Sequence, residues 1–368
     1  MQAPEALVSR PRPPLRPAAR RWRVAAAIAL GLLLLVPAAL AATPPARGSD
    51  SSPVAAQLEL LQRASAAVVG LRVDAIEGAM SAESLGQRRT GSGVVIGQDG
   101  LILTIGYLLL EAQSIEVTTS QDKTLPARAV AYDLATGFGL LQPLVPLRGV
   151  QPAVLGSSAA LTPGDLVLAG IGSTGEGNGG GIGMTQLVSK RAFSGYWEYH
   201  IESALFTSPP VPNHSGAPLF NQKGELIGIG SLFTTDAVGG GRRGVPGNMF
   251  VPVDLLKPVL AEMQATGSTR ASRRPWLGLT SSEQAGRVEI VRVSRESPAA
   301  AAGLQPGDVV LEIDGAKVAT LEAFYKQLWT HGEPEAEIEL TVLQGADVRK
   351  IRLRAIDRMQ TLRKPAGI

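Results

Sequence analysis

Hydrophobic and polar residues change their spacing several times along the 368-residue chain, and each change indicates a different kind of element. Residues 24–42 form an apolar run without a charge, and residues 55–67 repeat apolar positions at helical spacing. After that, short runs rich in Val, Leu and Ile alternate with turns rich in Gly, Asp, Asn and Pro every 8–15 residues. Such spacing is typical of antiparallel barrels or sandwiches and not of alternating strand–helix units. The pattern therefore predicts a mostly β body.

The pattern becomes helical again over residues 253–265 and then changes to mixed α and β after a small, polar and basic stretch. In this last part, strands surround one helix expected near residues 321–329. We predict a basic arm with a signal peptide or membrane anchor, a linker, a large β domain, a second linker, a smaller α+β domain and a tail. Their bounds are residues 1–42, 43–54, 55–264, 265–274, 275–357 and 358–368.

The N-terminal part has the features of an export segment. Six Arg and one Glu lie in residues 1–23, and the 19 apolar residues that follow would span about 28 Å as a helix. Basic residues before such a run keep the N-terminus in the cytoplasm and direct the rest across the membrane. Ala39-Leu40-Ala41 has the form of a signal-peptidase site. A cleaved signal peptide and a retained anchor in the inner membrane both fit, and we expect a periplasmic or cell-envelope body.

Composition excludes several kinds of chemistry. The chain has no Cys and only three His, so a thiolate site, a cysteine nucleophile and a multi-His metal centre are not expected. Basic and acidic residues number 35 and 32, and the excess lies in the N-terminal arm, so we expect no nucleic-acid partner. The Gly-rich residues 170–183 lack the phosphate-loop signature, and both they and residues 239–244 are predicted to be surface loops. We expect no cofactor and no metal.

The most informative segment reads Asn213-His214-Ser215-Gly216-Ala217-Pro218-Leu219. A Ser before Gly, in a turn that leads into an apolar strand, can present its hydroxyl beside backbone N–H groups that bind a developing oxyanion. Segments GSGVVIGQDGLILTIGYLLLEA (91–112) and AYDLATGFGLLQ (131–142) precede it in the chain. These segments give the weak Ser-Gly signal a more specific context.

In these segments the chain resembles the HtrA/Deg family of envelope serine proteases over about residues 54–357. The resemblance implies a trypsin-like (chymotrypsin-like) double β-barrel followed by an α+β PDZ domain. It places Tyr107 at the family's catalytic His position, Gly137 at the Asp position and Ser215 at the nucleophile position. A second alignment would place Asp133 at the Asp position. Asn213, with Ser215, falls at the oxyanion-hole position, where Asn213 replaces a Gly.

A serine hydroxyl needs a base to become a nucleophile, and the sequence offers few. Tyr107, with an ordinary pKa near 10, would leave only about 0.1% phenolate at pH 7 and is expected to form a hydrogen bond to Ser215 instead. We expect His214 in a turn, His200 on a strand and His331 at a helix end. Lys190 is the candidate for a Ser–Lys pair. The sequence therefore favours an inactive protease domain.

The second domain resembles a PDZ module along its whole length. Residues Trp276, Leu277, Gly278 and Leu279 match the carboxylate-binding loop and the strand after it, and residues 297–308 match the family's S-P-A…A-G-L-x-x-G-D signature. The resemblance implies strand addition, in which a peptide C-terminus pairs with the strand edge and loop N–H groups hold its carboxylate. Arg273 or Arg274 could add positive charge at this loop, although as linker residues we expect both to be solvated.

We therefore expect an envelope protein that binds polypeptide C-termini or unfolded proteins and acts as an adaptor, a holdase or a regulator of an active protease relative. One alternative is an active endopeptidase that uses Ser215 with an unconventional base. The other is a structural subunit of an oligomer. The family's trimers use N-terminal aromatic residues, and residues 54–70 contain none, so a trimer is not favoured.

Overall fold

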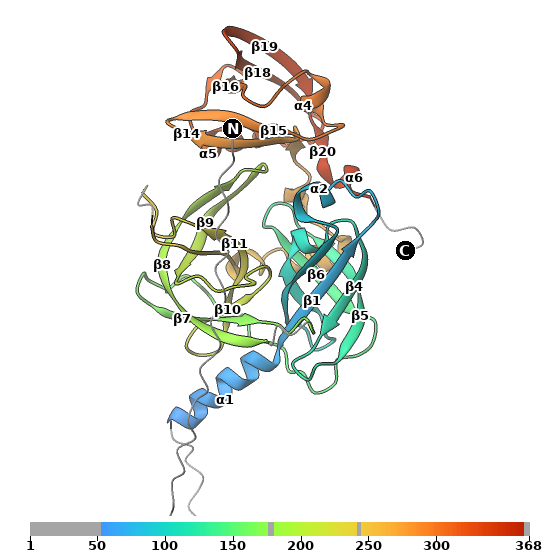
Figure 1. Cartoon of the computed structure of the whole chain (residues 1–368), viewed down its shortest axis with the longest axis vertical. Coiled ribbons are helices and arrows are strands. Elements are labelled where there is room, and N and C mark those ends of the chain that lie inside the picture. The colour runs from blue at the N-terminus through green and yellow to red at the C-terminus, as the bar shows by residue number, and fades with distance from the viewer. Residues whose placement is uncertain (1–52, 176–179, 241–243, 364–368) are drawn as a thin grey trace, which may run out of the picture. The chain divides into compact units, whose positions relative to one another are not determined.

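The computed structural model describes residues 53–175, 180–240 and 244–363 (Figure 1). These residues form a mostly β structure, which confirms the predicted fold class. The predicted basic arm and apolar run, residues 1–42, lie outside the described ranges. Inside those ranges, every helix is too short or too polar to cross a membrane.

The first half of the β domain is a closed barrel of six antiparallel strands. Around the barrel the strand order is β1-β2-β3-β6-β5-β4. Fully buried Val, Leu, Ile and Phe side chains of its strands contribute to the core, among them Leu71, Ile102, Leu103 and Phe138. The strands are β1 (Val68–Ala75), β2 (Arg88–Val95), β3 (Ile102–Ile105), β4 (Ala112–Thr118), β5 (Thr124–Tyr132) and β6 (Phe138–Pro143).

A second closed barrel follows, with the strand order β10-β11-β12-β9-β8-β7. Its longest strands, β8 and β9, form a hairpin that extends from the barrel and turns between Gly195 and Tyr199. The strands are β7 (Leu166–Ile171), β8 (Gly181–Gly195), β9 (Tyr199–Ser208), β10 (Pro218–Phe220), β11 (Leu226–Thr234) and β12 (Gly247–Pro252).

The two barrels meet closely enough that glycine is required at the contact. A Cβ on Gly70 of β1 would lie 1.8 Å from the carbonyl oxygen of Ser173, and one on Gly172 would lie 2.1 Å from that of Val69. A backbone hydrogen bond also joins the two barrels, because Ser92 N–H donates to the carbonyl of Ser215 at 2.8 Å. These contacts place the Ser215 turn against the first barrel.

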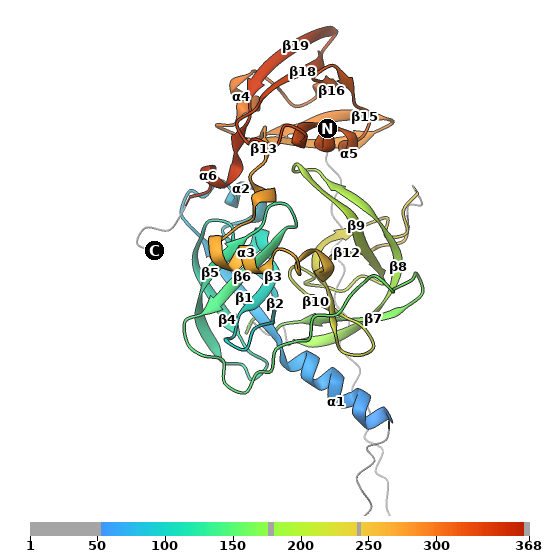
Figure 2. The same cartoon turned by 180° about the vertical axis from the view of Figure 1, so that it is seen from behind.

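Short helices surround the barrels. Helix α1 (Pro53–Ala66) leads directly into β1, close to the helix predicted over 55–67. Figure 2 shows helix α3 (Leu260–Thr266) lying against the first barrel at β5, where Tyr132 N–H donates to the carbonyl of Gly267 at 3.0 Å. The remaining short helices of this part are α2 (Ala82–Leu85), η1 (Gly106–Leu109), η2 (Val253–Leu255), α3 (Leu260–Thr266) and η3 (Arg270–Ser272).

Two sequence-based predictions of local structure were wrong. The helix predicted over 253–265 is divided into η2 and α3, with Pro258 between them, because proline lacks the N–H that a continuous helix needs. The loop predicted over 170–183 includes strand at both ends, since Gly170 and Ile171 belong to β7 and Gly181–Gly183 pair with it as the start of β8. Glycine-rich composition concealed the period-2 pattern there. Residues 176–179 lie outside the described ranges.

The C-terminal unit is a sheet covered by one amphipathic helix. The strand order is β14-β15-β16-β18-β19, with β17 on β16, and a separate pair joins β13 to β20. Helix α5 (Leu321–Trp329) buries Leu321, Phe324, Tyr325 and Leu328 against the sheet, and Thr320 caps its first turn by accepting from Ala323 N–H. The other elements are β13 (Pro275–Trp276), β14 (Leu279–Gln284), β15 (Arg287–Val293), α4 (Pro298–Ala301), β16 (Val309–Ile313), β17 (Ala316–Lys317), β18 (Glu337–Gln344), β19 (Asp347–Arg354), β20 (Ile356–Asp357) and α6 (Arg358–Thr361).

Candidate active site and peptide groove

Tyr107 lies on the short helix η1, directly after β3, and its backbone is held by a buried arginine. Arg89, only 4% exposed, donates to the carbonyl groups of Tyr107 at 3.2 Å and Leu110 at 2.7 Å, and to Ser81 Oγ at 2.8 Å. Burial lowers the pKa of Arg89, while Glu111 acts in the opposite direction. The guanidinium fixes η1, and with it the direction of the Tyr107 ring.

The structure brings Tyr107 and Ser215 together. The phenol oxygen lies 2.7 Å from Ser215 Oγ and 2.7 Å from the carbonyl oxygen of Ser231. A phenol has one proton to donate, and a carbonyl oxygen can only accept. When the proton points to Ser231, the phenol oxygen accepts the hydrogen bond of the Ser215 hydroxyl. In either arrangement the serine proton stays on the serine.

Burial makes Tyr107 still less acidic than an ordinary tyrosine. Desolvation raises the pKa of Tyr107 to about 12, and the hydrogen bond with Ser215 offsets this only in part. At pH 7 the phenolate fraction is then about one part in 10⁵. The ring therefore acts as a hydrogen-bonding partner of Ser215 and not as its base.

The turn that carries Ser215 contains two residues with a positive φ. Asn213 has a φ of 50° and Gly216 a φ of 72°, both in the left-handed region. Asn is among the side chains that adopt this region most readily, which explains how it replaces glycine at 213. A Cβ on Gly216 would lie 2.1 Å from the carbonyl oxygen of Ser92, so glycine is required there. In the described part of the chain, the N–H groups of Asn213, His214 and Ser215 have no hydrogen-bond partner.

Gly137 supplies no carboxylate to this site. It has a φ of 84°, and its carbonyl accepts the N–H of Gly106 at the start of η1 at 2.7 Å. Asp133, the other candidate for the acidic position, is fully buried and bonded elsewhere. Its carboxylate accepts from Thr136 N–H at 3.0 Å and from the hydroxyls of Thr269 and Ser272. Asp133 therefore connects β5 and β6 to the linker after α3.

The other candidate bases have different partners. His200 Nδ1 bonds to Ser194 Oγ at 2.9 Å, and His331 Nε2 bonds to Asp314 Oδ2 at 2.8 Å. Lys190 Nζ donates to the carbonyl groups of Ser158, Ala159 and Leu161 at 2.8, 3.2 and 3.4 Å.

His214 is the nearest imidazole along the chain. Burial lowers the pKa of His214, so it is neutral at physiological pH. Among the described hydrogen bonds, none joins the His214 ring to Ser215, whose hydroxyl bonds to Tyr107.

One group of possible metal ligands occurs in the described part of the chain. His200, Glu202 and Glu322 offer ligand atoms within 4.8 Å of one another. The ammonium of Lys326 lies 2.8 Å from Glu202 and 2.7 Å from Glu322. Because this lysine already supplies the positive charge between the two carboxylates, we assign no metal to the group.

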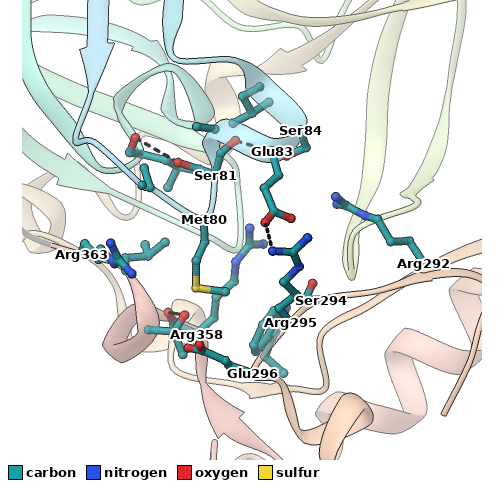
Figure 3. Close-up of a pocket in the computed structure, with 18 of the residues that line it drawn as sticks. Met80, Ser81, Glu83, Ser84, Arg292, Ser294, Arg295, Glu296, Arg358 and Arg363 are labelled. Atoms are coloured by element: carbon teal, nitrogen blue, oxygen red, sulfur yellow. Dashed lines mark hydrogen bonds and ion pairs between the residues drawn. The ribbon is translucent and has the colours of Figure 1, made fainter. Parts of the chain in front are cut away.

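Two cavities lie near the site. One of about 210 Å³ is lined by Tyr107, Ser215 and Arg89 and by four neighbouring residues. A larger one, of about 670 Å³, lies between residues 78–87 and the C-terminal unit, and Figure 3 shows Glu83 and Arg295 directed at each other beside it, with 3.5 Å between them. Ser215 does not line this larger cavity, so the serine site is confined to the small one.

The predicted carboxylate-binding loop is occupied by a residue that sequence reasoning missed. The N–H groups of Leu277, Gly278 and Leu279 donate to the carboxylate of Glu198, at 3.1, 2.8 and 2.8 Å. Glu198 lies in the turn of the β8–β9 hairpin and is 2% exposed. No local pattern could have indicated it, because the contact joins residues about 80 positions apart.

Arg274 also differs from its predicted role as a solvated residue. Its guanidinium donates to the carbonyl of Glu198 at 3.1 Å and lies 3.5 Å from the ring centroid of Trp329. Desolvation lowers the pKa of Arg274 to about 10. Arg273, by contrast, is exposed.

Comparison with known proteins indicates the same class of protein as the fold does. Residues 91–229 match the trypsin-like peptidase domain family, and residues 275–354 match the PDZ domain family. A Halomonas elongata protein named "Probable periplasmic serine endoprotease DegP-like" is 30% identical over 278 residues, covering 72% of this chain and 56% of the relative. A protein of the same name from Pseudomonas putida is 32% identical over 246 residues, covering 62% and 48%. The chain thus spans about half the length of these curated relatives.

A solved structure of the HtrA-type protease AlgW with a tripeptide has a TM-score of 0.50 and 22% identity, covering 84% of this chain and 98% of that one. Two closed barrels that meet at a Ser-Gly turn, followed by a sheet with one covering helix, define a trypsin-like peptidase domain joined to a PDZ domain. Among such proteins, this chain belongs to the HtrA/Deg-like family.

Proposed function

We propose that the protein is a catalytically inactive HtrA/Deg-like protein that binds polypeptide C-termini through its PDZ domain. The observation that carries the first part is the hydrogen bond between Ser215 Oγ and the Tyr107 phenol, 2.7 Å long, with the pKa of Tyr107 raised to about 12 by burial. In this proposal Tyr107 replaces the catalytic His, Gly137 replaces the Asp, and Ser215 is a retained but unactivated nucleophile.

The size of the loss supports an inactive domain. Removing members of a Ser-His-Asp triad lowers turnover by a factor on the order of 10⁴–10⁶. This corresponds to about 5–8 kcal/mol of activation free energy. The unpaired N–H groups of residues 213–215 would stabilise an oxyanion, but such a hole alone retains only a small part of the rate.

The binding part of the proposal rests on the PDZ loop. Three successive N–H groups at 277–279 converge on one carboxylate, so the loop has the donors that a peptide C-terminus requires. We propose as clients the C-termini of unfolded or misassembled envelope proteins, and the role of adaptor, holdase or regulator of an active relative. The names of these relatives support a periplasmic location. Residues 1–42 would export the body or anchor it to the inner membrane.

The inactive state is tested by cleavage of an unfolded protein. We expect the purified full chain and its Ser215→Ala variant to leave reduced, unfolded casein equally intact over hours, as followed by gel electrophoresis. Cleavage by the wild-type chain that disappears in Ser215→Ala would establish the alternative, an active endopeptidase with an unconventional base.

Binding is tested separately, with peptides that differ only at their C-terminus. Matched peptides with a free carboxylate and with an amide are titrated against the full chain by fluorescence polarisation. We expect only the carboxylate form to bind. Equal binding of both forms would contradict C-terminal recognition and leave the inactive-protease proposal unaffected.

A further inference from the structure

The β8–β9 turn contacts the PDZ groove as a peptide ligand would. The side-chain carboxylate of Glu198 takes the three loop N–H groups at 277–279. Two residues earlier, the carbonyl of Tyr196 accepts the N–H of Ser281 on β14 at 2.8 Å. In strand addition, a ligand pairs its backbone with the groove strand while its terminal carboxylate sits in the loop. The segment Tyr196–Glu198 provides both contacts, with a side-chain carboxylate in place of a terminal one.

The helix side of the groove is contacted as well. Tyr325 of α5 is fully buried, and its hydroxyl donates to the carbonyl of Gly195 at 2.8 Å. Strand β14 and helix α5 therefore both bind the same turn, one through Ser281 and the other through Tyr325. A second strand could not pair with Leu279 and Ser281 without displacing the turn, because the N–H groups of both residues already donate to it.

Charge also ties the turn to the loop. Glu198 is 2% exposed and has a φ of 57°, an uncommon backbone conformation for a side chain of this size. A buried carboxylate is tolerated only when donors surround it, and the donors here belong to the PDZ loop. Lys326 of α5 adds a contact outside the groove, since its ammonium lies 2.8 Å from Glu202 on β9.

We propose that Glu198 is an internal ligand of the PDZ carboxylate-binding loop, and that an external C-terminal carboxylate binds by displacing it. This inference rests on the proposed C-terminal binding for its second half, because competition requires that the external ligand use the same loop. Its first half, occupation of the loop by Glu198, does not depend on any external ligand. The two halves are therefore tested by different measurements.

Occupation of the loop is measured by amide hydrogen exchange in the full chain without peptide. We expect the amides of Leu277, Gly278 and Leu279 to exchange at least about tenfold faster in Glu198→Ala than in the wild type. Glu198→Gln keeps the side-chain size and is expected to act in the same direction. Glu337, exposed on β18, gives the matched charge control Glu337→Gln, in which these amides should exchange as in the wild type. Unchanged protection in folded Glu198→Ala and Glu198→Gln chains would overturn the inference.

Displacement is measured with a fluorescein-labelled peptide that has the sequence of residues 191–198 and a free C-terminus. We expect Glu198→Ala to bind this probe at least about tenfold more tightly than the wild type and Glu337→Gln to bind it as the wild type does. A probe that carries Glu198→Gln and an amidated C-terminus, and so has no carboxylate, should bind none of them. Equal affinity for wild type and Glu198→Ala would contradict displacement. Faster amide exchange without any probe binding would retain the internal ligand and refute the proposed C-terminal binding.

Discussion

Tyrosine and histidine differ in what they can do for a neighbouring hydroxyl. A neutral imidazole has one N–H donor and one nitrogen that accepts a proton near neutral pH, whereas a phenol oxygen has no comparable basicity. At Tyr107 the carbonyl of Ser231 provides an acceptor for the phenol proton. The tyrosine thus satisfies the polar groups around Ser215 and leaves the hydroxyl unactivated.

Restoring the base alone is expected to restore little activity. In Tyr107→His the new imidazole has no carboxylate to orient it, because residue 137 is glycine. We expect fluorophosphonate labelling of Ser215 to be faster in Tyr107→His/Gly137→Asp than in Tyr107→His. At a φ of 84°, the Asp would also cost about 1–2 kcal/mol of stability, and its Cβ would lie 3.3 Å from the hydroxyl of Tyr199. Equal labelling of both variants would contradict the assignment of Gly137 to the acidic position.

The raised pKa of Tyr107 predicts a pH dependence of stability. The folded-state pKa is about 12 and the unfolded value is about 10, so the stabilisation is complete below pH 10 and is lost as pH rises toward 12. In Tyr107→Phe this loss is absent. We expect the free energy of unfolding, from urea titrations at pH 9 to 11.5, to fall less steeply in Tyr107→Phe than in the wild type. If the free energy of unfolding fell equally steeply with pH in both proteins, this would show that the phenol is not buried.

Between elements, Asp133 has a structural role that its sequence context concealed. Its carboxylate is buried and joins the β5–β6 connection to the linker through Thr136, Thr269 and Ser272. Asp133→Ala would leave these donors without an acceptor, and we expect it to lower the free energy of unfolding by about 3 kcal/mol. Asp165→Ala is the control, since Asp165 accepts from Thr162 N–H at an exposed turn and should cost about 1 kcal/mol or less. Equal losses in urea unfolding would refute the structural role.

The elements that the sequence predicted correctly are those determined by residues close together in the chain. Short β-rich runs separated by turn residues predict the barrel strands, and apolar residues at helical spacing predict α5. The break at Pro258 was also local and could have been predicted from the missing N–H. The strand pairing of Gly181–Gly183 could not have been predicted, since glycine has no side chain whose polarity would reveal a period-2 pattern.

The contacts of the candidate site also divide into those that the sequence predicted and those that depend on tertiary packing. The family resemblance predicted the contact between Tyr107 and Ser215, whereas the position of Glu198 depends on packing between the second barrel and the PDZ domain. Burial of Arg274 on Trp329 has the same origin. Contacts of this kind depend on three-dimensional distances that a single sequence does not contain.

Over the whole molecule, one turn connects the three folded parts. Glu198 holds the PDZ loop, and the adjacent Tyr199 donates its hydroxyl to the carbonyl of Thr136 in the first barrel at 2.6 Å. Thr136 precedes Gly137, at the proposed acidic position. A peptide that displaces Glu198 would therefore act on residues adjoining the serine site, which by the proposed function has no catalytic base.

The central claim is that Ser215 has no group able to remove its proton. Its most direct test is the rate of covalent labelling of the full chain by a fluorophosphonate at pH 7–9, read by intact-protein mass spectrometry, beside Ser215→Ala. The account predicts the same negligible labelling of both proteins across this range. Stoichiometric labelling of the wild type within minutes, absent from Ser215→Ala, would contradict it.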